Sequence, residues 1–162
     1  MTDQICTQPH GSANAKKRRA LCDSRRTRVH ENLTHPMYEL RILVADDFVP
    51  WRAQARSLLQ QRPEWQIVEA CDGLEAVHKA TELRPDIVVL DIAMPILNGI
   101  EAAQKIRETS PHSRIIFVTT DGDADVKAAA LATGAQAYLS KARAATELLP
   151  TIAATLDEYQ TA

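Results

Sequence analysis

The sequence lacks the features that define several protein classes. No apolar stretch in its 162 residues approaches the roughly 20 residues that a membrane-spanning helix needs. The basic run of residues 16–19 is not followed by the apolar segment of a secretory signal. The three cysteines are odd in number and irregularly spaced, so they indicate no disulfide framework, and the five histidines form no catalytic pair. We therefore expect a cytoplasmic protein with reduced thiols and no membrane partner.

The charge of the chain is unevenly distributed. Residues 1–36 hold seven Lys or Arg and three acidic residues, a net of +4, whereas the remainder has a net of −6. The basic segment also lacks apolar periodicity, so we expect residues 1–38 to be a disordered tail and residues 39–160 to form one folded domain. No aromatic residues are interleaved with the basic ones, and we therefore expect a solvated leader without a nucleic-acid partner. Two alternatives stay open: nucleic-acid binding through the tail, and translation that begins at Met37.

From residue 40 onward, strand and helix patterns alternate five times. Continuous apolar runs are typical of strands that are buried on both faces, and short loops between strands and helices favour right-handed crossovers. The predicted fold class is α/β, a doubly wound (βα)5 domain with a five-stranded parallel sheet in the order 2-1-3-4-5. The expected strands cover residues 42–45, 66–70, 87–90, 115–118 and 137–139, and the expected helices begin near residues 50, 74, 100, 123 and 145.

Polar side chains follow four of the expected strands. Asp46 and Asp47 come directly after the first strand, Asp91 after the third, Thr119 after the fourth and Lys141 after the fifth. In an open α/β sheet, ligands bind at the carboxyl ends of the strands, and the first and third strands are neighbours in this order. The three carboxylates therefore predict a site for a divalent cation in which one carboxylate is free to act as a nucleophile.

Four segments carry a family resemblance. The segments ILVADD, VVLDIAMP, FVTT and YLSK resemble the receiver domain of bacterial two-component response regulators, in order and at suitable separations, over about Arg41 to Tyr159. The resemblance implies that Asp91 accepts a phosphoryl group from the phosphohistidine of a sensor histidine kinase or a phosphotransfer protein. The chain is then expected to be a signalling module and not a turnover enzyme, with at most slow self-catalysed phosphoryl transfer and dephosphorylation.

The resemblance also implies a Mg²⁺ site. Its expected ligands are Asp46, Asp47, Asp91 and the backbone carbonyl of Ala93, with Asp47 as the direct ligand of the adjacent pair and Asp46 acting partly through water. Oxygen ligands of this kind suit Mg²⁺, which also compensates the charge of a transferring phosphoryl group.

Three further residues have roles that the resemblance implies. Lys141 is expected to pair with Asp91 before transfer and with the phosphoryl group afterwards, and Thr119 to offer its hydroxyl to a phosphoryl oxygen. Tyr138 is expected to move inward when that hydroxyl moves, which would switch a surface formed by the fourth helix, the fifth strand and the fifth helix. This surface would bind an output protein that the sequence does not identify, or a second copy of the chain.

One position departs from the commonest receiver pattern. Ala142 follows Lys141 where many receivers have proline, and together with Glu147-Leu148-Leu149 it resembles the NarL/FixJ-type receivers. Those receivers usually precede a DNA-binding domain, which we do not expect here because the sequence ends shortly after the last predicted helix. A receiver that works as a decoy or adaptor without phosphate is the remaining alternative.

Overall fold

The structure, a computed structural model, describes residues 39–120 and 122–157. The predicted tail of residues 1–38 lies outside these residues and stays a prediction. Within the described part, no helix is long and apolar enough to cross a membrane. The strands are β1 Arg41–Ala45, β2 Gln66–Ala70, β3 Ile87–Leu90, β4 Arg114–Thr119 and β5 Ala137–Ser140; the helices are α1 Val49–Leu59, α2 Gly73–Leu83, α3 Gly99–Thr109, α4 Ala124–Ala132 and α5 Ala144–Asp157, with a 3₁₀ turn η1 Lys141–Arg143 before α5.

The five strands form one parallel sheet in the order β2-β1-β3-β4-β5, which confirms the predicted fold class and strand order. Ala45, the last residue of β1, is the register partner of Leu90, the last residue of β3. The residues that follow these two strands, Asp46 and Asp91, therefore begin neighbouring loops at the same edge of the sheet.

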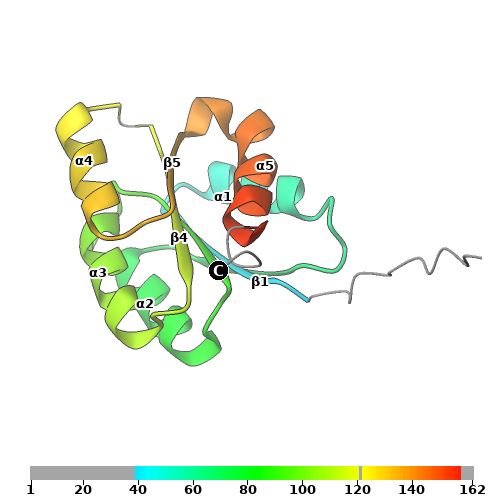
Figure 1. Ribbon diagram of the computed structural model, residues 1–162, viewed down its shortest axis with the longest axis horizontal. Coiled ribbons are helices and arrows are strands. Elements are labelled where there is room, and N and C mark those ends of the chain that lie inside the picture. Colours follow the sequence, from blue (N-terminus) through cyan, green and yellow to red (C-terminus); the bar gives the residue numbers. More distant parts are fainter. Residues whose placement is uncertain (1–38, 121, 158–162) are drawn as a thin grey trace, which may run out of the picture. The chain divides into compact units, whose positions relative to one another are not determined.

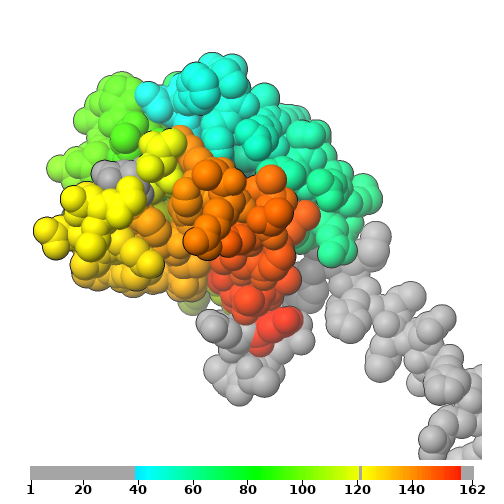
Figure 2. Space-filling model, turned by 90° about the horizontal axis from the view of Figure 1, so that it is seen from above, coloured from blue at the N-terminus to red at the C-terminus, as the bar shows by residue number. Residues whose placement is uncertain are grey.

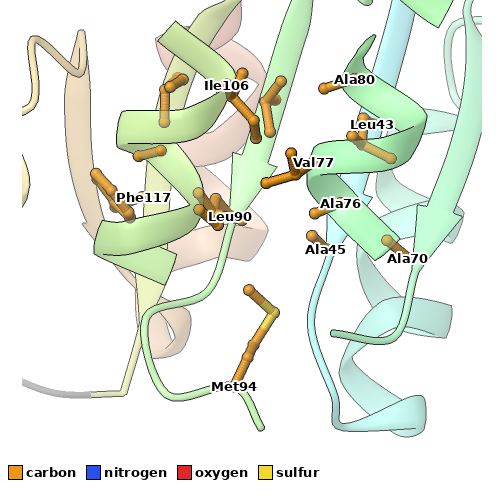
Figure 3. Packing of buried hydrophobic residues seen from close by; sticks show 14 of the residues in the cluster. Leu43, Ala45, Ala70, Ala76, Val77, Ala80, Leu90, Met94, Ile106 and Phe117 are labelled. Carbon is orange, nitrogen blue, oxygen red and sulfur yellow. The ribbon is translucent and has the colours of Figure 1, made fainter. Parts of the chain in front are cut away.

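Side chains of successive strand residues point to opposite faces of the sheet, and each face has its own apolar core. Leu43, Leu90 and Phe117 belong to the core beneath α2, α3 and α4, where alanine and valine side chains of α2 face the sheet (Figures 1 and 3). Val44 and Ile116 belong to the core beneath α1 and α5 on the other face (Figure 1). Because both faces are covered, the central strands are apolar throughout, which explains the continuous runs in the sequence.

Local signals in the sequence set several helix ends. Asp72, Asn98 and Asp123 are the N-cap residues of α2, α3 and α4, and their side chains accept hydrogen bonds from backbone N–H groups of the first turn. Gly134, with φ of +84°, follows α4 in the left-handed conformation that glycine adopts readily. The expected helix starts near residues 50, 74 and 123 lie within one residue of the observed starts of α1, α2 and α4, and α1 begins at Val49, one residue before Pro50.

Gly99 determines how closely α3 approaches the end of β3. A Cβ atom at this position would lie 1.9 Å from the backbone oxygen of Asp91 and 2.8 Å from the Cα atom of Ile92. Both contacts involve backbone atoms, which cannot move aside as a flexible side chain could. Only glycine therefore allows the first turn of α3 to pack against the residue that follows β3.

We expect Gly99→Ala to destabilise the domain by about 3 kcal/mol, because the added methyl group forces the backbone at Asp91 or α3 to shift. Urea unfolding monitored by circular dichroism measures the change. Gly122→Ala is the matched control, since a Cβ atom at that position meets no described atom within 4 Å. Equal unfolding midpoints for the two variants would contradict the packing described for Gly99.

Candidate functional site

Three carboxylates meet at the carboxyl edge of the sheet. Asp46 follows β1 and is fully buried, Asp91 follows β3 and is 3% exposed, and Asp47 is exposed to solvent. Each offers an oxygen atom, and these three atoms lie within 4.8 Å of one another. Figure 2 looks onto this edge, where the cyan start of α1 and the green, yellow and orange segments after β3, β4 and β5 gather. The convergence follows from the sheet order, because β1 and β3 are neighbours.

The side chain of Lys141 reaches the carboxylates from the end of β5, the strand at one edge of the sheet. It follows β5, and its Nζ atom lies 2.5 Å from Oδ2 of Asp46 and 3.1 Å from Oδ2 of Asp91. Only 11% of the side chain is exposed, so these contacts are poorly screened by solvent. In the described part of the chain every peptide bond is trans, and the N–H of Ala142 donates to Oγ of Ser140 at the start of the 3₁₀ turn. This turn directs Lys141 back over the strand ends.

Burial dominates the electrostatics of Asp46. The loss of solvation raises the pKa of its carboxyl group above 3.8, and the nearby charge of Asp91 acts in the same direction. Hydrogen bonds from Lys141 and from the backbone N–H of Phe48 lower the pKa but do not offset the burial. Because the pKa is raised in the folded state, the ionised form of Asp46 reduces stability as pH rises through that pKa.

The residues at this edge fit a Mg²⁺ ion. Oδ1 of Asp91 is buried and has no hydrogen-bond partner in the described part of the structure, although its second oxygen is paired with Lys141. An unpaired buried carboxylate oxygen is costly, and Mg²⁺ prefers oxygen ligands of this kind. Asp47 leaves part of its carboxylate open to solvent, which suits an ion that keeps several waters. Ala93 lies two residues after Asp91, exposed in the loop between β3 and α3.

The two remaining predicted residues lie on β4 and β5. Thr119 ends β4, is fully buried, and is the register partner of Ser140, which directly precedes Lys141. Its hydroxyl is therefore held at the same edge of the sheet as the lysine. Tyr138 is half-buried on β5 against the core beneath α4, and Nζ of Lys127 lies 5.7 Å from the centroid of its ring. An aromatic residue thus links the strand end to the surface of α4.

Two contributors were not predicted as site residues. Trp51 in α1 is 6% exposed, and the Nζ atom of Lys141 lies 5.1 Å from its ring centroid. Arg52, the next residue, donates from Nη1 to the backbone oxygen of Asp46 at 2.6 Å. Trp51 lies only four residues after Asp47 in the sequence, but no sequence signal identifies the side chain that its ring contacts.

Comparisons with known proteins identify relatives of this chain. The family model described as the response regulator receiver domain matches residues 42–153. Among curated proteins, the protein-glutamate methylesterase/protein-glutamine glutaminase of Thermotoga maritima is 41% identical over 105 residues, 63% of this chain. The chain spans 30% of the length of that relative.

Solved structures give the same result. The signal receiver domain of a response regulator named NarL from Mycobacterium tuberculosis has a TM-score of 0.65 and 28% identity, covering 73% of this chain and 94% of that one. A CheX-CheY-BeF3-Mg²⁺ complex from Borrelia burgdorferi contains a chain with a TM-score of 0.68 and 28% identity, covering 72% of this chain and 89% of that one. The predicted resemblance to NarL-type receivers is thus confirmed.

Proposed function

Because this chain belongs to the response regulator receiver domain family, we propose that it works in phosphorylation-dependent signalling and that Asp91 is its phosphoacceptor. The observation that supports this assignment most strongly is the buried, unpartnered Oδ1 atom of Asp91 beside two further carboxylates and one ammonium group. A carboxylate has two oxygen atoms, so that of Asp91 can bind the metal ion through one of them and act as a nucleophile toward phosphorus through the other.

In the proposed reaction, an oxygen atom of Asp91 forms a bond to phosphorus while the bond from phosphorus to the imidazole nitrogen of a donor phosphohistidine breaks. The product is an acyl phosphate on Asp91 and a histidine whose nitrogen takes up a proton. Bound Mg²⁺ would supply positive charge beside the transferring oxygens, with Asp46, Asp47, Asp91 and the carbonyl of Ala93 as its protein ligands.

The chain's own residues position and stabilise the phosphoryl group. The Lys141 ammonium already lies 3.1 Å from Asp91, and it turns from the carboxylate to a phosphoryl oxygen as negative charge moves outward. The hydroxyl of Thr119 donates a hydrogen bond to another phosphoryl oxygen. Tyr138, one strand away, follows that hydroxyl inward, and the surface of α4, β5 and α5 changes with it.

Receiver domains act with kinases and output proteins, and we propose the same arrangement here. The phosphoryl donor is a sensor histidine kinase or a phosphotransfer protein, and the changed surface binds an output protein or a second copy of this chain. The receiver domain is assigned to residues 39–160 and the preceding residues to a basic tail. The esterase activity named for the Thermotoga maritima relative is a property of that longer protein.

Removing Mg²⁺ is expected to prevent phosphorylation. With acetyl phosphate and Mg²⁺, intact-protein mass spectrometry of the full chain should show the gain of one phosphoryl group, because the metal compensates charge that Lys141 alone cannot. With excess EDTA, we expect no gain in the same time. Addition of Mg²⁺ beyond the capacity of the chelator should restore it. An equal yield with and without the metal would contradict the proposed role of the carboxylates.

A further inference from the structure

The ammonium group of Lys141 has a third neighbour besides the two carboxylates. Its Nζ atom lies 5.1 Å from the centroid of the Trp51 ring, within the distance at which a cation is attracted to the face of an aromatic ring. Lys141 comes from the segment after β5 and Trp51 from the first turns of α1. The contact therefore holds the lysine side chain against α1, on the side of the site away from β5.

The indole N–H suggests why an aromatic residue occupies this position. Nε1 of Trp51 is buried and has no hydrogen-bond partner among the described residues. A leucine or methionine would fill an apolar site without leaving a donor unpaired, so filling space does not by itself account for tryptophan. What the indole adds is the negative face of a large ring, which gives the strongest cation–π interaction of the aromatic side chains.

We propose that Trp51 is a positioning residue that holds the Lys141 ammonium over the phosphorylation site, an inference that rests on the proposed function of Asp91. The other neighbours of the ammonium change during the reaction. The carboxylates would bind the metal ion, and phosphorylation removes the charge of Asp91. The ring face does not change. It keeps the ammonium from being drawn wholly to Asp46, whose Oδ2 atom is the nearest described oxygen at 2.5 Å.

A spectroscopic test addresses the contact itself, whether or not the protein is phosphorylated. Protons above an aromatic ring resonate upfield, so the side-chain ε-methylene signal of Lys141 in the labelled full chain should lie upfield of other lysines. Lys141→Met assigns this signal by removing it. In Trp51→Leu the shift should disappear, and in Trp51→Phe it should be partly retained. A wild-type Lys141 signal at the ordinary lysine position would overturn the proposal.

A kinetic test addresses the consequence. We expect Trp51→Leu to slow formation of the acetyl-phosphate adduct by roughly two- to thirty-fold, the range that corresponds to loss of a cation–π interaction. Trp51→Phe, which keeps a ring face, should recover most of the rate. Thermal unfolding of each variant verifies that the protein is folded at the assay temperature.

The chain offers a matched control. Trp65 also lies near a cation, with Cζ of Arg62 at 6.0 Å from its ring, but it belongs to the segment before β2 and packs against the core beneath α1 and α5. Trp65→Leu should leave the rate unchanged. A wild-type rate in Trp51→Leu, or a rate in Trp51→Phe as low as in Trp51→Leu, would overturn the role of Trp51. Absence of any adduct on the wild type would instead overturn the proposed function.

Discussion

Asp91→Asn is expected to abolish the phosphoryl adduct that acetyl phosphate and Mg²⁺ produce on the wild-type chain. The amide keeps the size and shape of the carboxylate, but it is a poor nucleophile and cannot form the acyl phosphate. It also removes one of the charges that attract the metal. Intact-protein mass spectrometry over a time course gives the yield for both proteins.

Asp72→Asn is the matched control for this substitution. Asp72 is the N-cap of α2, where its side chain accepts the backbone N–H of Glu75, and asparagine serves equally well as an N-cap. The control should therefore be phosphorylated as fully as the wild type. If Asp91→Asn acquired the same adduct at the same rate, the phosphoacceptor would be another residue.

Lys141→Met should reduce the free energy of unfolding by about 3 to 5 kcal/mol at neutral pH in the absence of metal. Methionine replaces the aliphatic part of the side chain, so the main loss is the ammonium between the buried carboxylates of Asp46 and Asp91. Removal of one partner leaves the others buried without a counter-charge. Urea unfolding in a chelating buffer measures the difference.

The pH dependence identifies the cause of that loss. Burial already raises the pKa of Asp46, and removal of the ammonium raises it further, so the penalty is present above this pKa and fades as the carboxyl group takes up a proton. The destabilisation by Lys141→Met should therefore shrink on acidification. A loss of stability that is the same at all pH values would indicate a packing defect instead.

Lys79→Met provides the comparison with an exposed ion pair. Nζ of Lys79 lies 2.7 Å from Oε1 of Glu75, but both side chains are about one-third exposed. Exposed pairs on a helix contribute less than about 1 kcal/mol, so this variant should lose far less stability than Lys141→Met. Similar losses in the two variants would contradict the special burial of the site.

The fold was predictable because the buried strands and the helix starts each leave a local signal in the sequence. Continuous apolar runs such as residues 87–90 identified the central strands, and caps such as Asp123 identified helix starts. The bounds of the helices were less predictable. α1 begins after Phe48, whose side chain makes no capping hydrogen bond, so Pro50 in the first turn indicates this start only to within one residue. α5 continues across Pro150 because Leu148 and Ile152 are buried on the same helical face.

The sequence predicted which strand ends carry the polar residues, since strand order alone places those ends together. It did not predict which of the two adjacent aspartates is buried. Asp46 is enclosed and Asp47 exposed because the loop after β1 turns immediately into α1, with the N–H of Phe48 bound to the Asp46 carboxylate. The contact between Trp51 and Lys141 depends on how α1 meets the turn after β5, and no local pattern encodes such a tertiary contact.

Peptide mapping of the phosphorylated wild-type chain tests the central assignment most directly. After incubation with acetyl phosphate and Mg²⁺, borohydride reduces an aspartyl phosphate to homoserine, which marks the acceptor in the sequence of the peptide. Phosphorylation of Asp91 predicts homoserine at residue 91, in the peptide that contains β3. Homoserine at residue 46 or 47, or an adduct that leaves residue 91 unchanged, would contradict it.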